Sequence, residues 1–518
     1  MGEEGGGRSC GTTRDLQKLK QQAMEYYREN DVPRRLEELL NSTFYLQPAD
    51  VYGHLANCFS KLAKPPTICK VVGKNVLDGL GLPTLQVEIF CTIQNFPKNI
   101  CSVVISTHFE VHENALPKLV EAEELERSDA VSTAVRWVNE TITEELQGLA
   151  PSSQAEVDQV LRTFFESKVQ EDKERKELEK SLEDSTVPTP SPLTPPLPPP
   201  PPAKKKGQKQ GRKDTLTEKP IVPPEPVEPI LCGSMAIGAV SLAVAKTSAV
   251  LGNNPLYLNI ALLKHHQDQP AKLTMPLLMV SLVSCGKSSP GKLNFMKEVI
   301  CIPHPGLTAK QGVDMLLEIQ KHINKTIEMS PPPKPETKKG HNGGKRGQDS
   351  EQWDSTYNAL GSKCYIIAGT ASKSISKLLE DGNIGILRCS GLIVKHTNQT
   401  TMSDLVEMTN LIDSKKHIAV FGSAEGESSD DSLVDLAVGL GVRFIKLGGL
   451  SRGERVTKYN RLFTIEEELV QNGTLGFSEE HTFFYLNEEA EKAAMAGELP
   501  EPPEPIFATE VVEQSAKT

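Results

Sequence analysis

The 518-residue sequence lacks the patterns typical of zinc sites, secreted proteins and membrane spans. Its ten cysteines are scattered singly, without a Cys-x-x-Cys pair or a His/Cys spacing suited to zinc, so we expect reduced thiols in a cytoplasmic protein. The first residues, MGEEGGGRSC, have no apolar core, and we expect no signal peptide. The most apolar stretch, residues 235–251, contains Lys246 and many small residues, which favours a closely packed internal helix over a membrane span.

An excess of basic charge is also missing. The net charge is −11, and the local lysine clusters are confined to stretches that read as linkers, so we expect no nucleic-acid partner. The 38% hydrophobic content is enough for one large core or two to three ordinary ones, which predicts a globular protein over most of the length.

Residues 1–65 predict a helical extension. Apolar residues recur at helical spacing after the glycine-rich start, and two short helices follow, opened by Pro33 and by Pro48-Ala49-Asp50. The stretches VPRRLEELL and QPADVYGHLANCF resemble the dimerisation and docking helices of protein-kinase-A regulatory subunits, which implies docking to amphipathic helices of scaffold proteins. The alternative is a helical extension that packs on the main body.

The next part of the chain predicts an α+β domain interrupted by an insertion. Residues 66–165 read as antiparallel strands followed by helices, and residues 231–270 complete the domain. Between them, residues 166–230 form a charged and proline-rich insertion that we expect to be disordered, although its charged start, up to residue 184, also fits a solvated helix. The proline tract is a spacer or a ligand for an SH3 or WW domain.

Residues 271–473 predict an α/β barrel that is incomplete, and an acidic, proline-containing tail covers 474–518. Short apolar strands alternate with amphipathic helices, which favours a parallel sheet covered by helices, and a second linker occupies 330–350. Lys395 and Lys446 each stand at the C-terminal end of a predicted strand, where barrels place their sites.

Four long stretches carry a family resemblance: VLDGLGLPTLQVEIF (76–90), MAIGAVSLAVAKTSAVLGNNPLY (235–257), GLIVKHTNQ (391–399) and SRGERVTKYNRLFTIEEEL (451–469). Together they resemble the enolase family, and within it a divergent sperm-type branch of vertebrates. The resemblance implies an α+β N-terminal domain followed by an α/β (TIM-type) barrel, a homodimer, and a place in the cytoplasm or the sperm flagellum.

The resemblance also implies an activity and its residues. Enolases convert 2-phosphoglycerate to phosphoenolpyruvate and water in glycolysis, with a lysine base and two Mg²⁺ ions; the enolase superfamily is itself a standard example of this arrangement. Lys395 matches the proton-accepting lysine, and Glu298 and Lys446 match substrate-binding residues.

Several positions depart from the family pattern. Ser289 replaces a histidine, residues 106–114 replace the loop that closes over the substrate, and GSAEGES (422–428) replaces the phosphate-binding loop. The last change removes a cation, and we expect Glu425 and Glu427 to repel an anionic substrate.

The magnesium ligands are missing from the sequence. Gly369 aligns with one metal-binding aspartate, and at about 30 residues per strand–helix unit the barrel segment holds about six units rather than eight. The segment with the other metal carboxylates, of roughly a hundred residues, should lie near 330–350, and we interpret the chain as an internally deleted form with no metal ligands. Two functions remain: a phosphopyruvate hydratase with weak or no activity, or a structural enolase-like protein of a sperm flagellar or cytoskeletal assembly.

Overall fold

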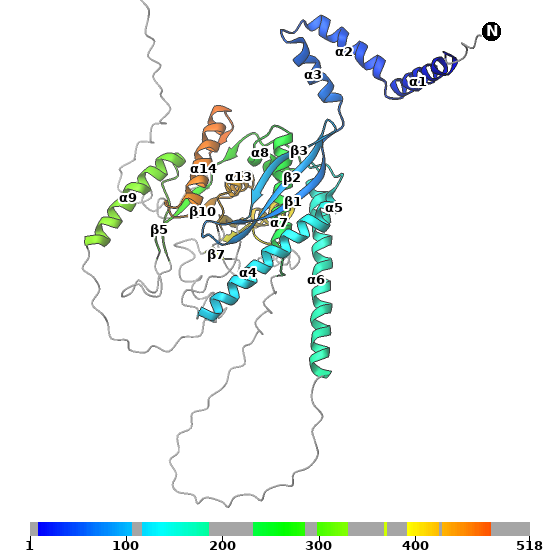
Figure 1. The fold of residues 1–518 in the computed structure, drawn as a ribbon. Helices are drawn as coiled ribbons and strands as arrows, with labels where there is room; N and C mark the ends of the chain where they lie inside the picture. Colours follow the sequence, from blue (N-terminus) through cyan, green and yellow to red (C-terminus); the bar gives the residue numbers. More distant parts are fainter. Residues whose placement is uncertain are drawn as a thin grey trace, which may run out of the picture. The chain divides into compact units, whose positions relative to one another are not determined.

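The computed structural model describes most of the chain (Figure 1), in two compact units that we treat separately. One unit is Met1–Thr67 with Cys91–Lys98, and the other is Ile68–Phe90 with Asn99–Thr518. The described residues are 9–105, 117–185, 231–284, 298–329, 367–369, 391–423 and 427–477. The loop at 106–114, the proline tract and the linker at 330–350 lie outside them, and so do residues 373–381, for which the sequence pattern also predicts a helix.

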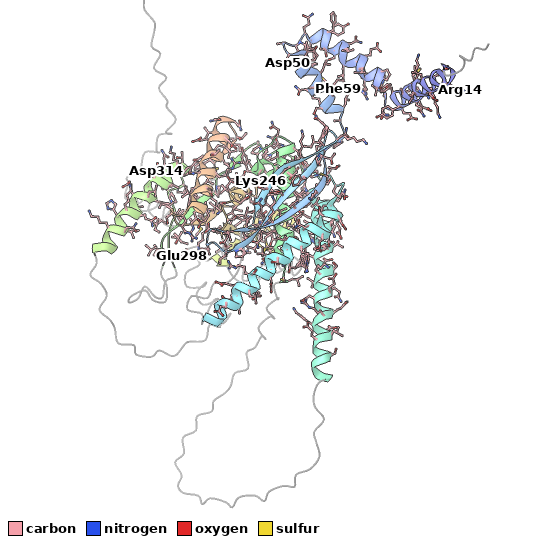
Figure 2. The ribbon with its side chains drawn as sticks, in the orientation of Figure 1. Arg14, Asp50, Phe59, Lys246, Glu298 and Asp314 are labelled. Atoms are coloured by element: carbon pink, nitrogen blue, oxygen red, sulfur yellow. The ribbon has the colours of Figure 1, made fainter. Side chains whose placement is uncertain are left out.

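The first unit contains the three helices that periodicity predicts, α1 (Ser9–Glu29), α2 (Val32–Leu46) and α3 (Val51–Leu62). Pro33 stands in the first turn of α2, and the Asp50 carboxylate caps α3 by accepting a hydrogen bond from Gly53 N at 2.8 Å (Figure 2). In α2 only Thr43 is buried, and no residue of α3 is. These helices therefore bury almost none of their apolar side chains within this chain.

The second unit begins with the antiparallel elements and helices predicted for 66–165. Its three-stranded sheet has the order β1 (Thr67–Leu77), β2 (Pro83–Ile93) and β3 (Phe96–Val104). The helices that follow are α4 (Pro117–Trp137), the π-helical turn η1 (Val138–Ile142), α5 (Thr143–Leu146) and α6 (Gln154–Ser185).

The charged stretch belongs to helix α6, which agrees with the prediction of a solvated helix. The prediction of disorder is therefore wrong for residues 166–185. Ion pairs along one side of the helix hold it, with Lys168 Nζ 2.8 Å from Glu171 and Lys176 Nζ 2.6 Å from Asp172. Pairs at three- and four-residue spacing stabilise a helix by a few tenths of a kcal/mol each, about 0.2–0.5.

The apolar stretch 235–251 is a buried helix, as predicted. Most residues of α7 (Met235–Leu251) are buried, and its charge, Lys246, lies 3.6 Å from Asp430 (Figure 2). Helix α8 (Leu256–Lys264) packs against α7. No single helix in the described residues is long and apolar enough to cross a membrane; α7 and α8 pass that test only as a pair, bent by 108°.

A buried carboxylate joins three helices of this unit. Asp158 of α6 accepts hydrogen bonds at 2.6 Å from the hydroxyls of Ser241 in α7 and Ser403 in α12 (Met402–Ser414). Burial raises the pKa of Asp158, and the hydrogen bonds from Ser241 and Ser403 oppose that change.

The predicted parallel sheet is present, with six strands in the order β6-β5-β10-β9-β8-β7. Only β5 and β6 pair antiparallel. The strands are β5 (Leu277–Ser284), β6 (Glu298–Cys301), β7 (Ile367–Gly369), β8 (Gly391–Val394), β9 (Ile418–Gly422) and β10 (Phe444–Gly448).

One predicted strand was too long. The apolar run 273–283 predicts a single strand, but in the structure it divides at Met275-Pro276 into β4 (Leu273–Thr274), which pairs with β11 (Leu475–Gly476), and β5. Proline has no N–H to donate to a ladder, so the strand breaks there.

Helices cover the sheet, as an α/β fold requires. Contacts join α9 (Ala309–Met329) to β5, α12 to β9 and α14 (Gly453–Gln471) to β10, while α13 (Ser432–Gly439) packs on α8 and α14. Thr401 and Asp404 form a capping box that begins α12. Among the described strands the sheet does not close, because β6 and β7 are its two edges. The α/β class and the incomplete barrel are therefore confirmed.

Candidate functional site

One face of the six-stranded sheet carries an apolar cluster in the middle and lysines at the end. Leu277, Ile418, Val420 and Phe444 are buried together, with Ile393 packed against them. Alternate residues of a strand share a face. Two positions beyond these apolar residues therefore come Lys395, Gly422 and Lys446, at the C-terminal ends of three neighbouring strands.

The strand register places the two lysines on either side of Gly422. Lys446 is the Cα partner of Gly422, and Val394 is the partner of Phe421, so Lys395 comes level with Gly422 from the other side. A Cβ at Gly422 would lie 3.8 Å from both Cγ and Cε of Lys395. The Lys395 side chain therefore lies along this face, beside the strand that separates it from Lys446.

Glu298 reaches the same end of the sheet because β6 runs antiparallel. It is the first residue of β6, and its carboxylate forms an ion pair with Lys446 Nζ (Figure 2). Both side chains are about one-quarter exposed, at 23% for Glu298 and 26% for Lys446. The structure thus brings Glu298 and Lys446 into contact and places Lys395 two strands from β10, across Gly422.

Sequence reasoning missed the histidine that follows Lys395. His396 is buried, and burial lowers its pKa to about 4, although the nearby backbone of Gly238 and Thr400 acts in the opposite direction. The imidazole is therefore neutral at physiological pH. The one sign of this burial in the sequence is the apolar composition of residues 235–251, which form α7.

The expectation that Glu427 repels an anion is wrong. Its carboxylate is buried and accepts hydrogen bonds from Arg455 Nε at 3.0 Å and Lys458 Nζ at 3.3 Å, both on α14. Burial lowers the pKa of Lys458, and the charge of Glu427 opposes that shift. The charge of Glu427 is compensated by α14, while Glu425 lies outside the described residues.

The described residues do not fit a magnesium site. Mg²⁺ requires near-octahedral oxygen coordination and is usually held through carboxylates. No group of three His, Cys, Asp or Glu side chains in the described ranges could hold a metal ion. Glu298, the carboxylate that the site does contain, is engaged by Lys446. Gly369 ends β7, where the family pattern has an aspartate, and Ser289 lies outside the described residues.

Comparison with known proteins identifies the family. A family model described as "Enolase, C-terminal TIM barrel domain" matches residues 342–482. Enolase 4 of Homo sapiens is 70% identical to this chain over 620 aligned positions, covering 100% of the chain and 99% of the relative. The chain belongs to the enolase family.

Other enolase relatives agree with this assignment. Enolase 4 of Mus musculus is 60% identical, with 100% of both chains covered, and Enolase 4 of Danio rerio is 33% identical, covering 89% of this chain and 93% of the relative. The human alignment has 620 positions against 518 residues here, a difference of 102 positions without a counterpart in this chain. An internally deleted enolase explains that difference.

Proposed function

We propose that this chain is an enolase-family protein with little or no phosphopyruvate hydratase activity. The observation that carries the proposal is the strand-end face, which keeps Lys395, Lys446 and Glu298 but offers no set of magnesium ligands among the described residues. In this proposal Lys395 occupies the position of the proton acceptor, and Glu298 and Lys446 occupy those of the substrate-binding residues, but without the metal the three residues give no measurable turnover.

The chemistry explains why those three residues are insufficient. The proton next to the carboxylate of 2-phosphoglycerate is weakly acidic, and its removal needs cations that stabilise the developing negative charge. Enolases use Mg²⁺ for that purpose. The Lys446–Glu298 pair contributes no net charge to the face. Loss of metal stabilisation worth several kcal/mol lowers a rate by about tenfold for every 1.4 kcal/mol.

An activity measurement tests this proposal. The purified chain, given 2-phosphoglycerate and Mg²⁺, should form phosphoenolpyruvate at less than about one-thousandth of the rate of an enolase with a complete barrel. The Lys395→Ala variant should be indistinguishable from the parent chain. Turnover that depends on magnesium and disappears in Lys395→Ala would overturn the proposal.

The second function is structural, and the helical extension supports it. Helices α1–α3 expose large apolar side chains, including Leu40 (58% exposed) and Tyr52 (85%). Such surfaces are expected to be covered in the working protein. We propose that the extension pairs with a second copy of the chain, and that the paired helices hold an amphipathic helix of a scaffold protein. The cytoplasm, at a sperm flagellar or cytoskeletal assembly, is the location that the resemblance suggests.

The mass of the full chain in solution tests the pairing. Light scattering coupled to size-exclusion chromatography should give a dimer for the parent chain and a monomer for Leu40→Glu, because a charge would have to be buried in the paired surface. Leu125→Glu is the matched control, since Leu125 is also highly exposed but lies on α4. A parent chain that is monomeric, or a dimer that survives Leu40→Glu, would contradict the pairing.

A further inference from the structure

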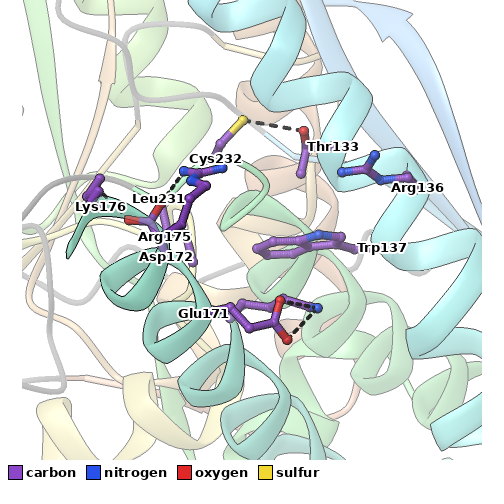
Figure 3. Close-up of a pocket in the computed structure, with 10 residues that line it drawn as sticks. Thr133, Arg136, Trp137, Glu171, Asp172, Arg175, Lys176, Leu231 and Cys232 are labelled. Carbon is purple, nitrogen blue, oxygen red and sulfur yellow. Dashed lines mark hydrogen bonds and ion pairs between the residues drawn. The ribbon is translucent and has the colours of Figure 1, made fainter. Parts of the chain in front are cut away.

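A cavity of about 510 Å³ lies between α4, α6 and the residues that lead into α7 (Figure 3). Its walls include Arg136 and Trp137 from α4, Arg175 and Lys176 from α6, and Cys232. The volume is within the range of small-molecule sites, about 300–1,000 Å³. The cavity shares no lining residue with the strand-end face, so the enolase reaction does not account for it.

The cavity carries a net positive charge. Four of its lining residues are basic and two are acidic, a difference of two positive charges. Both acids are already engaged by bases on the same helix: Glu171 lies 2.8 Å from Lys168, and Asp172 lies 2.6 Å from Lys176. A region of one sign in a concave surface attracts ligands of the opposite sign.

The cations stand on opposite walls. Figure 3 shows Arg136 on the α4 side and Arg175 with Lys176 on the α6 side, with Trp137 between them. Arg136 makes no ion pair with any residue that the structure describes. The Arg175 and Lys176 side chains are paired at the surface, where an ion pair contributes only about 0–1 kcal/mol, so an incoming anion can engage them at small cost.

Aromatic packing fixes the Trp137 ring in the middle of the cavity. The Trp137 ring meets Phe164 edge-to-face, with centroids 5.3 Å apart and planes at 86°. Trp137 is 8% exposed, so its ring is fixed, and its remaining surface lines the cavity. On the rim, the Cys232 thiol lies 3.4 Å from the hydroxyl of Thr133 and donates to it.

We propose that this cavity binds a small oligophosphate, with one phosphate at Arg136 and another at Arg175 and Lys176. Arginine is suited to phosphate because its planar donors match two oxygens at once, and lysine adds a compact charge. Cations on two walls favour a ligand with two or more linked anionic groups over a single phosphate. The oligophosphate is either free, as in pyrophosphate, or carried by a nucleotide such as ATP.

Tryptophan fluorescence of the full chain tests the proposal. The sequence has two tryptophans, so Trp353→Phe leaves Trp137 as the only reporter. Pyrophosphate or ATP should change its emission to saturation, and inorganic phosphate should bind much more weakly. Saturation by pyrophosphate supports a free oligophosphate, and saturation by ATP alone supports a nucleotide. The affinity should fall as salt is raised, since the attraction is between accessible charges.

Two substitutions that each remove one positive charge test whether the oligophosphate binds in this cavity. Arg136→Ala should weaken binding about tenfold, because one charge-assisted phosphate contact is lost. Lys321→Ala, which removes another exposed cation, from α9, should leave the affinity unchanged. Circular dichroism checks that both variants keep their helix content. No saturable change with pyrophosphate or ATP, or equal affinities for Arg136→Ala and Lys321→Ala, would overturn the proposal.

Discussion

Two oppositely charged side chains, Glu427 and Lys458, hold residues 427 and 428 against α14. Lys458 donates to the carboxylate of Glu427 and also to the backbone oxygens of Ser428, at 2.9 Å, and Glu454, at 2.8 Å. An ammonium with three acceptors has its three donors satisfied, which is the condition under which a buried charge is tolerated. The residues that replace the family's phosphate-binding loop thus join the barrel to its last helix.

At the same scale, His396 makes stability depend on pH. Its pKa is about 4 in the folded chain and about 6.5 in the unfolded chain, so between these values the unfolded state binds a proton that the folded state does not. Stability is therefore complete above pH 6.5 and is lost as the pH falls towards 4, by about 3 kcal/mol in total.

Chemical denaturation at pH 7 and pH 5 measures this contribution. The free energy of unfolding should fall less between the two pH values in His396→Gln than in the parent chain, because the glutamine does not titrate. His265→Gln is the control, since it replaces an exposed histidine by glutamine in the same way. A parent-like pH dependence in His396→Gln would show that another group is responsible.

Among the elements, the edge strand β6 differs most from the strands inside the sheet. Strand β9 is paired on both sides, with β8 and β10, whereas β6 pairs with β5 alone among the described strands. Val299 of β6 and the helix that follows, with Met315 and Ile319, expose apolar side chains. An unpaired edge with apolar neighbours is a template for pairing with another strand.

Hydrogen exchange should separate these two strands. At low protein concentration, amides of 298–301 should exchange at least about tenfold faster than those of 418–422, because they open without unfolding the sheet. Mass spectrometry of peptides that cover each strand gives the rates. Equal protection would mean that another segment or a second chain covers β6.

At the scale of the whole molecule, local patterns predicted the elements and the family resemblance predicted the architecture. The apolar run that ends in Lys395 showed where β8 ends, whereas Lys446 lies inside β10; the proline and aspartate before α3 showed where that helix begins. The sequence could also predict that the barrel has about six strand–helix units, since that number depends on length alone.

What the sequence could not predict depends on distant pairs. Glu427 is compensated by Arg455 and Lys458, which are 28 and 31 positions away, and nothing in the loop itself indicates that pairing. Strand β4 pairs with a strand about 200 residues later in the chain, β11, and nothing near Leu273 indicates that partner. The oligophosphate cavity joins residues of α4 and α6 to Cys232, across the whole proline-rich insertion.

The unpaired edges of the described sheet affect how much of this protein stays soluble in a cell. Among the described strands the sheet has one edge at β6 and the other at β7, so a second molecule can pair at either edge, and each addition leaves a new edge for the next. Association of this kind increases steeply with the concentration of the protein. We therefore expect solubility to limit the abundance of this form.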